Sequence, residues 1–102
     1  MKTLQVLGPS SGGIRRHVGT LTHGLIERGI EAQVVGPDEV MTGLVDHQEV
    51  APVSLGPRAP SAVAKLRRLS RGVDVVHAHG LTAGWISWLA VGRARLVVTV
   101  HN

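Results

Sequence analysis

The chain has 102 residues, of which 43% are hydrophobic and 18% charged, a balance typical of one folded domain with a modest core. It contains no cysteine, which excludes disulfide bonds, cysteine zinc sites and thiol catalysis. The formal net charge of +4 suits anionic partners, but the two aromatic residues are too few for a platform that stacks single-stranded nucleic acid, so we expect no nucleic-acid partner.

Strand-like and helix-like segments alternate in the first part of the chain. A β-rich run at 3–7 predicts a strand that ends at Gly8, and apolar residues at helical spacing then predict a helix that Gly29 terminates. A second strand is predicted at 32–35, and 38–47 is predicted as a loop.

Three more strands are predicted further along. The third, at 49–55, contains Pro52, which cannot donate to a ladder and therefore predicts an edge position. The fourth is predicted at 74–78. The fifth, at 96–100, is nearly continuous in β-branched residues, which is typical of a strand buried on both faces.

Two more helices separate these strands. Ser61 is predicted to cap a helix that runs through Arg71, and Thr82 is predicted to cap the next one. Trp85 and Trp88 lie three residues apart on one face of this second, mostly apolar helix. We expect both tryptophans to pack in the core.

The order of these elements predicts an α/β fold: a Rossmann-like, open and mostly parallel sheet of about five strands, with helices on both faces. Three polar motifs follow strands, at 8–13, 77–80 and 99–102. Because ligands bind outside the carboxyl ends of parallel strands, we expect these motifs to form one site. The apolar stretch at 81–91 is far shorter than the ~20 residues of a membrane span, so we expect a cytoplasmic protein.

The glycine-rich loop after the first strand is open to more than one interpretation. Its glycines, at positions 8, 12 and 13, do not have the dinucleotide-binding spacing. Ile14 and Arg15 stand where a P-loop has Lys and Ser or Thr, so an ATPase is excluded. Either the loop presents backbone N–H groups to a phosphate or sugar, or it is a tight turn that allows close helix–strand packing.

Histidines mark the ends of the last two strands. His77 and His79 share a strand face because side chains alternate along a strand. Together with His101 they have a spacing compatible with a metal, but no carboxylate accompanies them, so we expect no metal site. We expect His77 to be a hydrogen-bonded core residue, while His79 and His101 are either cleft residues or simple strand ends.

Basic residues gather around the helix that follows Ser61. They are Arg58, Lys65, Arg67, Arg68 and Arg71. Such a helix either presents a solvated face or binds anionic lipid headgroups. We favour the solvated face and keep the inner membrane surface as an alternative partner.

Four blocks, at 12–18, 25–37, 74–80 and 97–102, together resemble the family-four retaining glycosyltransferases over essentially the whole chain. The resemblance implies the GT-B fold, in which two Rossmann-like domains face a cleft. Residues 1–102 are then expected to be a truncated N-terminal, acceptor-side domain, with the donor-binding C-terminal domain absent from the chain. The implied reaction moves a sugar from a nucleotide-sugar to an acceptor hydroxyl with retention.

The same resemblance implies roles for individual residues. Gly12 and Gly13 are expected near the donor diphosphate, and His101 is expected to position the acceptor hydroxyl as the catalytic residue. The substrate-binding residues it implies are His79, Asn102 and Arg16. It also implies that the chain alone is inactive and binds no cofactor, the nucleotide-sugar being a co-substrate of the parent enzyme.

Two other functions are compatible with the sequence. One is a stand-alone Rossmann-like module that binds a phosphorylated small molecule, and the other is a basic module that binds a membrane or a polyanion. Separately, we expect the last strand to be an unpaired edge and the chain to self-associate through it.

Overall fold

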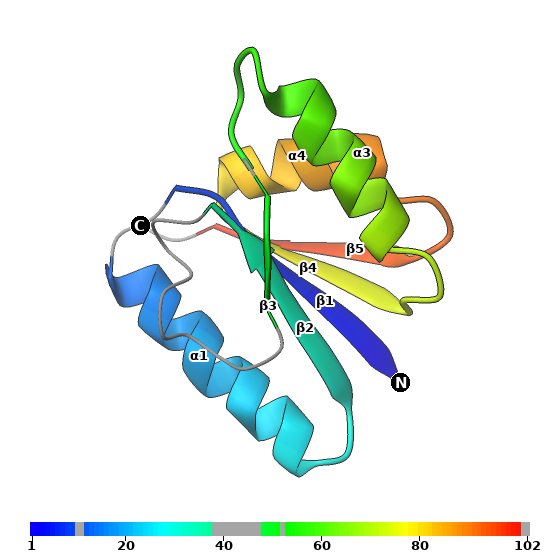
Figure 1. Cartoon of the computed structure of the whole chain (residues 1–102). Coiled ribbons are helices and arrows are strands. Elements are labelled where there is room, and N and C mark those ends of the chain that lie inside the picture. Colours follow the sequence, from blue (N-terminus) through cyan, green and yellow to red (C-terminus); the bar gives the residue numbers. More distant parts are fainter. Residues whose placement is uncertain (10–11, 38–47, 52, 101–102) are drawn as a thin grey trace.

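The computed structural model describes residues 1–9, 12–37, 48–51 and 53–100 (Figure 1). Strands and helices alternate along the chain in the predicted order. The elements are β1 (Lys2–Leu7), α1 (Gly12–Glu27), β2 (Glu31–Gly36), β3 (Gln48–Val50), α3 (Ala59–Leu69), β4 (Val75–His79), α4 (Leu81–Ala90) and β5 (Arg95–Thr99). The predicted loop at 38–47 lies outside the described residues.

The strands form one sheet with the order β3-β2-β1-β4-β5, in which every neighbouring pair is parallel. The predicted α/β, Rossmann-like class is therefore confirmed. Strand β1 lies in the middle of the sheet, with β2 and β3 on one side and β4 and β5 on the other. The strand order therefore reverses at β1. Such a reversal of strand order is where open α/β sheets bind their ligands.

Helices cover both faces of the sheet, with α1 on one face and α3 and α4 on the other (Figure 1). Residues aligned across parallel strands point to the same face, so the register assigns each side chain to a layer. Val35, Val6 and Ala78 are aligned and face α3 and α4. Gln5 and His77 are aligned and lie on the α1 face.

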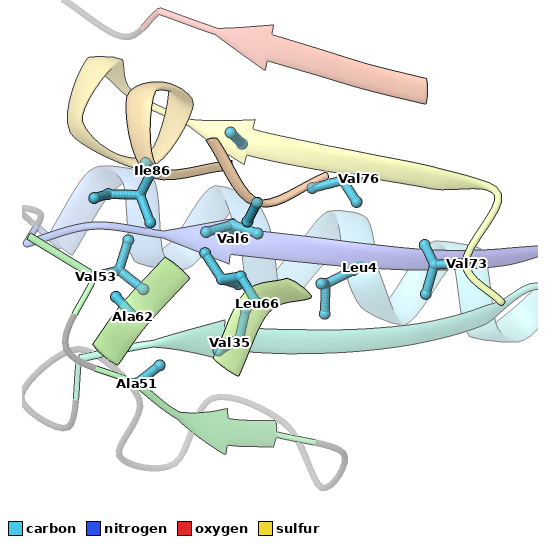
Figure 2. Close-up of a cluster of buried hydrophobic side chains, with 13 residues drawn as sticks. Leu4, Val6, Val35, Ala51, Val53, Ala62, Leu66, Val73, Val76 and Ile86 are labelled. Atoms are coloured by element: carbon cyan, nitrogen blue, oxygen red, sulfur yellow. The ribbon is translucent and has the colours of Figure 1, made fainter. Parts of the chain in front are cut away.

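The main hydrophobic core lies between the sheet and the α3–α4 layer (Figure 2). Leu66 of α3 and Ile86 of α4 are fully or almost fully buried against Leu4 and Val6 of β1. The apolar residues at helical spacing therefore dock the two helices. Burial of such side chains is the main favourable term in folding.

The two predicted helix caps are wrong, for different local reasons. Helix α3 begins at Ala59, before Ser61, because Pro60 in the first turn has a fixed φ suited to a helix start and no N–H to satisfy. Helix α4 begins at Leu81, and its N-cap is Gly80 with φ 95° and ψ 165°, which leaves no capping role for Thr82.

The third strand is shorter than predicted, although its edge position is confirmed. Strand β3 covers only Gln48–Val50. Beyond it, the Ala51 amide still donates to the Gly36 carbonyl at 2.9 Å, but the Val53 amide donates back to Ala51 at 2.8 Å. Beyond Ala51 the backbone therefore bonds locally instead of continuing the ladder with β2. Pro52 lies outside the described residues.

The prediction that the fifth strand is buried on both faces is wrong. Strand β5 lies at the other edge of the sheet, and Val97 and Val98, which point to opposite faces, are 47% and 41% exposed. Helix α1 packs on β1 and β2, away from β5. The β-branched composition therefore predicted a strand correctly, but not its burial.

None of the helices in the described ranges is long and apolar enough to cross a membrane.

Substitutions at Gly80 and Gly24 test whether the backbone conformation at the start of α4 depends on glycine. Gly80 has a conformation that only glycine adopts readily, so Gly80→Ala should lower the free energy of unfolding by about 1–3 kcal/mol. Gly24 lies inside α1 with no atom within 4 Å of an added Cβ, so Gly24→Ala should raise it by about 0.5–1 kcal/mol. Denaturant unfolding measures both values. Equal changes in the free energy of unfolding would contradict the view that the conformation of Gly80 depends on glycine.

Candidate functional site

The candidate site lies on the α1 face of the sheet, at the carboxyl ends of β1, β4 and β5. Leu7, His79 and Thr99 are aligned across these three strands. Parallel pairing therefore brings together residues that are up to 92 positions apart in the sequence. The first turn of α1 follows directly from the loop after β1, so the glycine-rich segment adjoins the same strand ends (Figure 1).

His79 is the buried polar centre of the site, with 2% of its surface exposed. Its Nε2 lies 2.8 Å from Oε1 of Gln5. Because a carbonyl oxygen only accepts a hydrogen bond, Nε2 carries the proton and donates it. This contact ties the end of β4 to the middle of β1 and fixes the orientation of the imidazole ring.

Two further histidines surround His79 and form with it a group that we call the histidine cluster: His17, His77 and His79. The rings of His77 and His79 are stacked, with centroids 4.1 Å apart, and His17 of α1 meets His79 edge-on at 6.1 Å. Nε2 of His77 lies 2.6 Å from the Thr99 hydroxyl. The cluster thus links α1, β4 and β5.

The stacked rings confirm that His77 and His79 share one strand face. His77 is hydrogen-bonded as predicted, but it is half-buried, because β4 is covered on this face only near its end. His79 is the more buried of the two. No group of three or more His, Cys, Asp or Glu side chains within the described residues could hold a metal ion.

The start of α1 provides the positive side of the site. The first backbone N–H groups of a helix have no partner within the helix, and the helix dipole adds about half a positive charge there. No acidic residue lies in the first turn of α1 to neutralise that charge. Gly12 and Gly13 form the beginning of this turn, and the exposed Arg16 follows in the next. The arrangement can attract an anion such as a phosphate.

The predicted site residues are thus brought together in part. Gly12, Gly13, Arg16 and His79 belong to α1 and the adjoining end of β4. His101 and Asn102 lie outside the described residues, so their predicted roles stay predictions.

Sequence reasoning missed Gln5, His17 and Thr99. Gln5 had a usable signal, because a glutamine in the middle of an otherwise apolar strand must find a hydrogen-bond partner when buried, and it is 2% exposed. His17 and Thr99 had no such local signal. Their contacts depend on how α1 and β5 are placed in the fold.

Of the basic residues of α3, Arg67 and Arg68 are exposed and Lys65 is half-buried, and Arg67 has a structural contact. Arg67 donates a hydrogen bond from Nη2 to the Leu89 carbonyl at 3.2 Å, near the end of α4. A cation there compensates the negative end of the helix dipole. This contact gives Arg67 a structural role although the residue is exposed, as Arg68 and Arg71 are.

The expectation that Trp85 and Trp88 pack in the core is wrong, since they are 57% and 62% exposed. Helix α4 turns Ile86 and Ala90 toward the sheet, which leaves the tryptophan side of the helix uncovered by the described residues.

An open parallel sheet whose strand order reverses at its central strand, with helices on both faces, defines a Rossmann-like α/β domain. The model of one protein family, Glycosyltransferase Family 4, matches residues 11–102. The chain therefore belongs to Glycosyltransferase Family 4. A search of curated proteins found no match.

The contact between Gln5 and His79 can be tested by removing the acceptor. Gln5→Met keeps the length of the side chain but leaves the buried His79 N–H without Oε1, so the free energy of unfolding should fall by about 1–3 kcal/mol. Gln33→Met, at a half-buried position of β2, should change it by less than about 0.5 kcal/mol. Denaturant unfolding compares the two variants, and equal values would refute a special role for Gln5.

Proposed function

We propose that this chain forms the acceptor-side part of the cleft of a GT-B glycosyltransferase. The parent enzyme transfers a sugar from a nucleotide-sugar to an acceptor hydroxyl with retention of configuration. The observation that carries this proposal is the meeting of the α1 N-terminus with the histidine cluster at the carboxyl edge of the sheet, in a chain of Glycosyltransferase Family 4. The positive helix end suits a diphosphate, and the neighbouring side chains suit a sugar hydroxyl.

Each residue has a distinct task in this proposal. The N–H groups of Gly12 and Gly13 approach the donor diphosphate, and Arg16 adds a positive charge beside it. His79, held by Gln5, is part of the cleft wall. His101 positions the acceptor hydroxyl, and Asn102 contacts the substrate next to it.

No protein nucleophile is assigned. Because donor binding in this type of enzyme depends mainly on a second domain, we propose that the isolated 102 residues do not turn over. The chain binds no cofactor of its own, and the nucleotide-sugar is a co-substrate. The location that suits this function is the cytoplasm, with the exposed basic residues of α3 available to an anionic inner membrane surface.

A second candidate is a stand-alone module for a phosphorylated metabolite, which the unneutralised N-terminus of α1 also favours. Binding strength separates the two functions. The acceptor-side domain should bind a nucleoside diphosphate weakly, whereas a dedicated module should bind its phosphorylated ligand tightly by itself.

Nuclear magnetic resonance titration of the chain with a nucleoside diphosphate tests where phosphate binds. We expect amide shifts at the start of α1. Arg16→Ala should weaken binding by about tenfold, because a hydrogen bond to a charged group contributes about 1.5–3 kcal/mol. Arg28→Ala is the matched control, since Arg28 is an equally charged, exposed residue just beyond the far end of α1. Equal weakening by both changes would show a diffuse charge effect and contradict the site.

The role of His101 is tested in the full gene product that contains this chain, by following nucleoside diphosphate release in the presence of an acceptor. His101→Ala should lower kcat by about 100-fold, because misplacement of a reacting group is costly. His23→Ala alters a histidine of α1 whose side chain is 75% exposed, and it should leave kcat unchanged. Undiminished transfer by the His101 variant would remove that residue from the mechanism.

A further inference from the structure

A cavity of about 1030 Å³ lies at the amino ends of the strands, opposite the candidate site. We call it the amino-end pocket, and it is lined by Met1, Arg67, 70–75 and 92–95. Its walls are the connections from α3 to β4 and from α4 to β5, which Figure 1 shows at the end of the sheet away from the tips of the arrows. Both connections belong to the described chain, so the pocket does not depend on any element beyond β5.

Arginine side chains dominate the polar lining of the amino-end pocket. They come from the last turn of α3, from the two connections and from the first residue of β5. The four are Arg67, Arg71, Arg93 and Arg95. Asp74 is the one acidic residue of the lining, so four positive charges against one negative charge give it a formal charge of +3. The pocket therefore attracts anions.

The carboxylate of Asp74 does not neutralise these arginines. Its Oδ2 accepts a hydrogen bond from the Lys2 backbone N–H at 2.8 Å, which holds it at the start of β1. Within the described ranges, the guanidinium groups of Arg71, Arg93 and Arg95 take part in no ion pair or hydrogen bond. Each guanidinium group carries five N–H donors in a fixed plane. These donors are available to a ligand.

The arginines also exceed what the neighbouring helix ends require. Helices α3 and α4 both end at the pocket, and the negative ends of their dipoles favour cations. At the end of α3, however, Ser70 already donates to the last turn from both its amide and its hydroxyl. At the end of α4, Arg67 donates to the Leu89 carbonyl. The other three arginines are therefore not needed to cap either helix.

The rest of the lining combines apolar surface with backbone donors. Val73 is buried, and Val75 and Ala94 are half-buried. Gly92 and Arg93 are exposed, and their amides donate to no backbone carbonyl of the described chain. Backbone N–H groups bind phosphate oxygens as guanidinium groups do. Apolar surface with a few well-placed polar groups is typical of a small-molecule site.

We propose that the amino-end pocket binds an organic anion that carries at least two phosphate groups. Guanidinium groups match phosphate geometry in pairs of hydrogen bonds, which carboxylates of a flexible peptide achieve less regularly. One phosphate monoester carries about 1.5–2 negative charges near neutral pH, so two of them match the charge of the lining. The five residues of β4, about 16 Å, separate this site from the histidine cluster. It is therefore a second anion site, independent of the first.

Nuclear magnetic resonance titration of the chain with inorganic tripolyphosphate tests the pocket. We expect saturable amide shifts at Gly72 and Gly92. Replacing Arg71 and Arg93 together by alanine should weaken this binding by at least about tenfold, because hydrogen bonds to charged groups are lost. The matched control replaces Arg28 and Arg68 by alanine, which removes the same charge from exposed positions outside the pocket.

Two results would overturn the proposal. One is the absence of shifts at Gly72 and Gly92, and the other is equal weakening by the two double variants. Circular dichroism verifies that both variants are folded. Arg16→Ala separates this site from the proposed function, because it should reduce phosphate binding at the start of α1 and leave the shifts at Gly72 and Gly92 unchanged.

Vesicle sedimentation distinguishes the two sources of such phosphates, a soluble molecule and a lipid headgroup. The vesicles consist of phosphatidylcholine with or without phosphatidylinositol bisphosphate. Binding that needs the bisphosphate and is abolished by the double change at Arg71 and Arg93 supports the site with a lipid headgroup as its ligand. Tripolyphosphate binding without vesicle binding supports the site with a soluble ligand. Vesicle binding that the control double variant weakens equally overturns the pocket as its cause and assigns it to diffuse surface charge.

Discussion

The parallel pairing of β1 with both of its neighbours is the constraint on which the rest of the structure depends. Strand β1 is central, so its odd and even residues define the two layers of the molecule. Leu4 and Val6 are fully buried toward α3 and α4, whereas Gln5 and Leu7 are buried on the α1 face. Because all strands run in one direction, the glycine-rich turn and the ends of β4 and β5 meet at one edge. The site is therefore a consequence of the pairing direction.

Burying the polar side chains of Gln5 and His79 costs desolvation free energy, which the hydrogen bond between them offsets. Two polar side chains, each 2% exposed, lie in a layer that valine or leucine could have filled. A satisfied hydrogen bond contributes only about 1 kcal/mol net, while a lost one leaves a full desolvation penalty. The contact therefore contributes more to orientation than to stability. The imidazole is thereby held in one orientation at the carboxyl end of β4.

Sequence patterns predicted the order of the elements, the edge position of β3 and the shared face of His77 and His79, because each of these depends on local periodicity or on one proline. The helix end at Gly29 was also predictable, since its φ of 78° lies in the left-handed region that favours glycine. The first residues of α3 and α4 were not predicted, because these helices begin at a proline-containing turn and at Gly80 and have no side-chain cap. The Gln5–His79 contact spans 74 positions, and no local pattern reports it. The exposure of Trp85 and Val97 likewise depends on which elements lie beside them.

The two ends of the described sheet differ in the length of their ladders. Strand β3 covers three residues, and beyond it the Val53 amide donates to the Ala51 carbonyl rather than to β2. Strand β5 pairs with β4 over five residues, and the Gly80 amide continues this ladder by donating to the Thr99 carbonyl at 2.8 Å. The candidate site lies on the side with the longer ladder. The pairing of β4 with β5 therefore reaches the start of α4, and it holds His77, His79 and Thr99 together at the carboxyl ends of the strands.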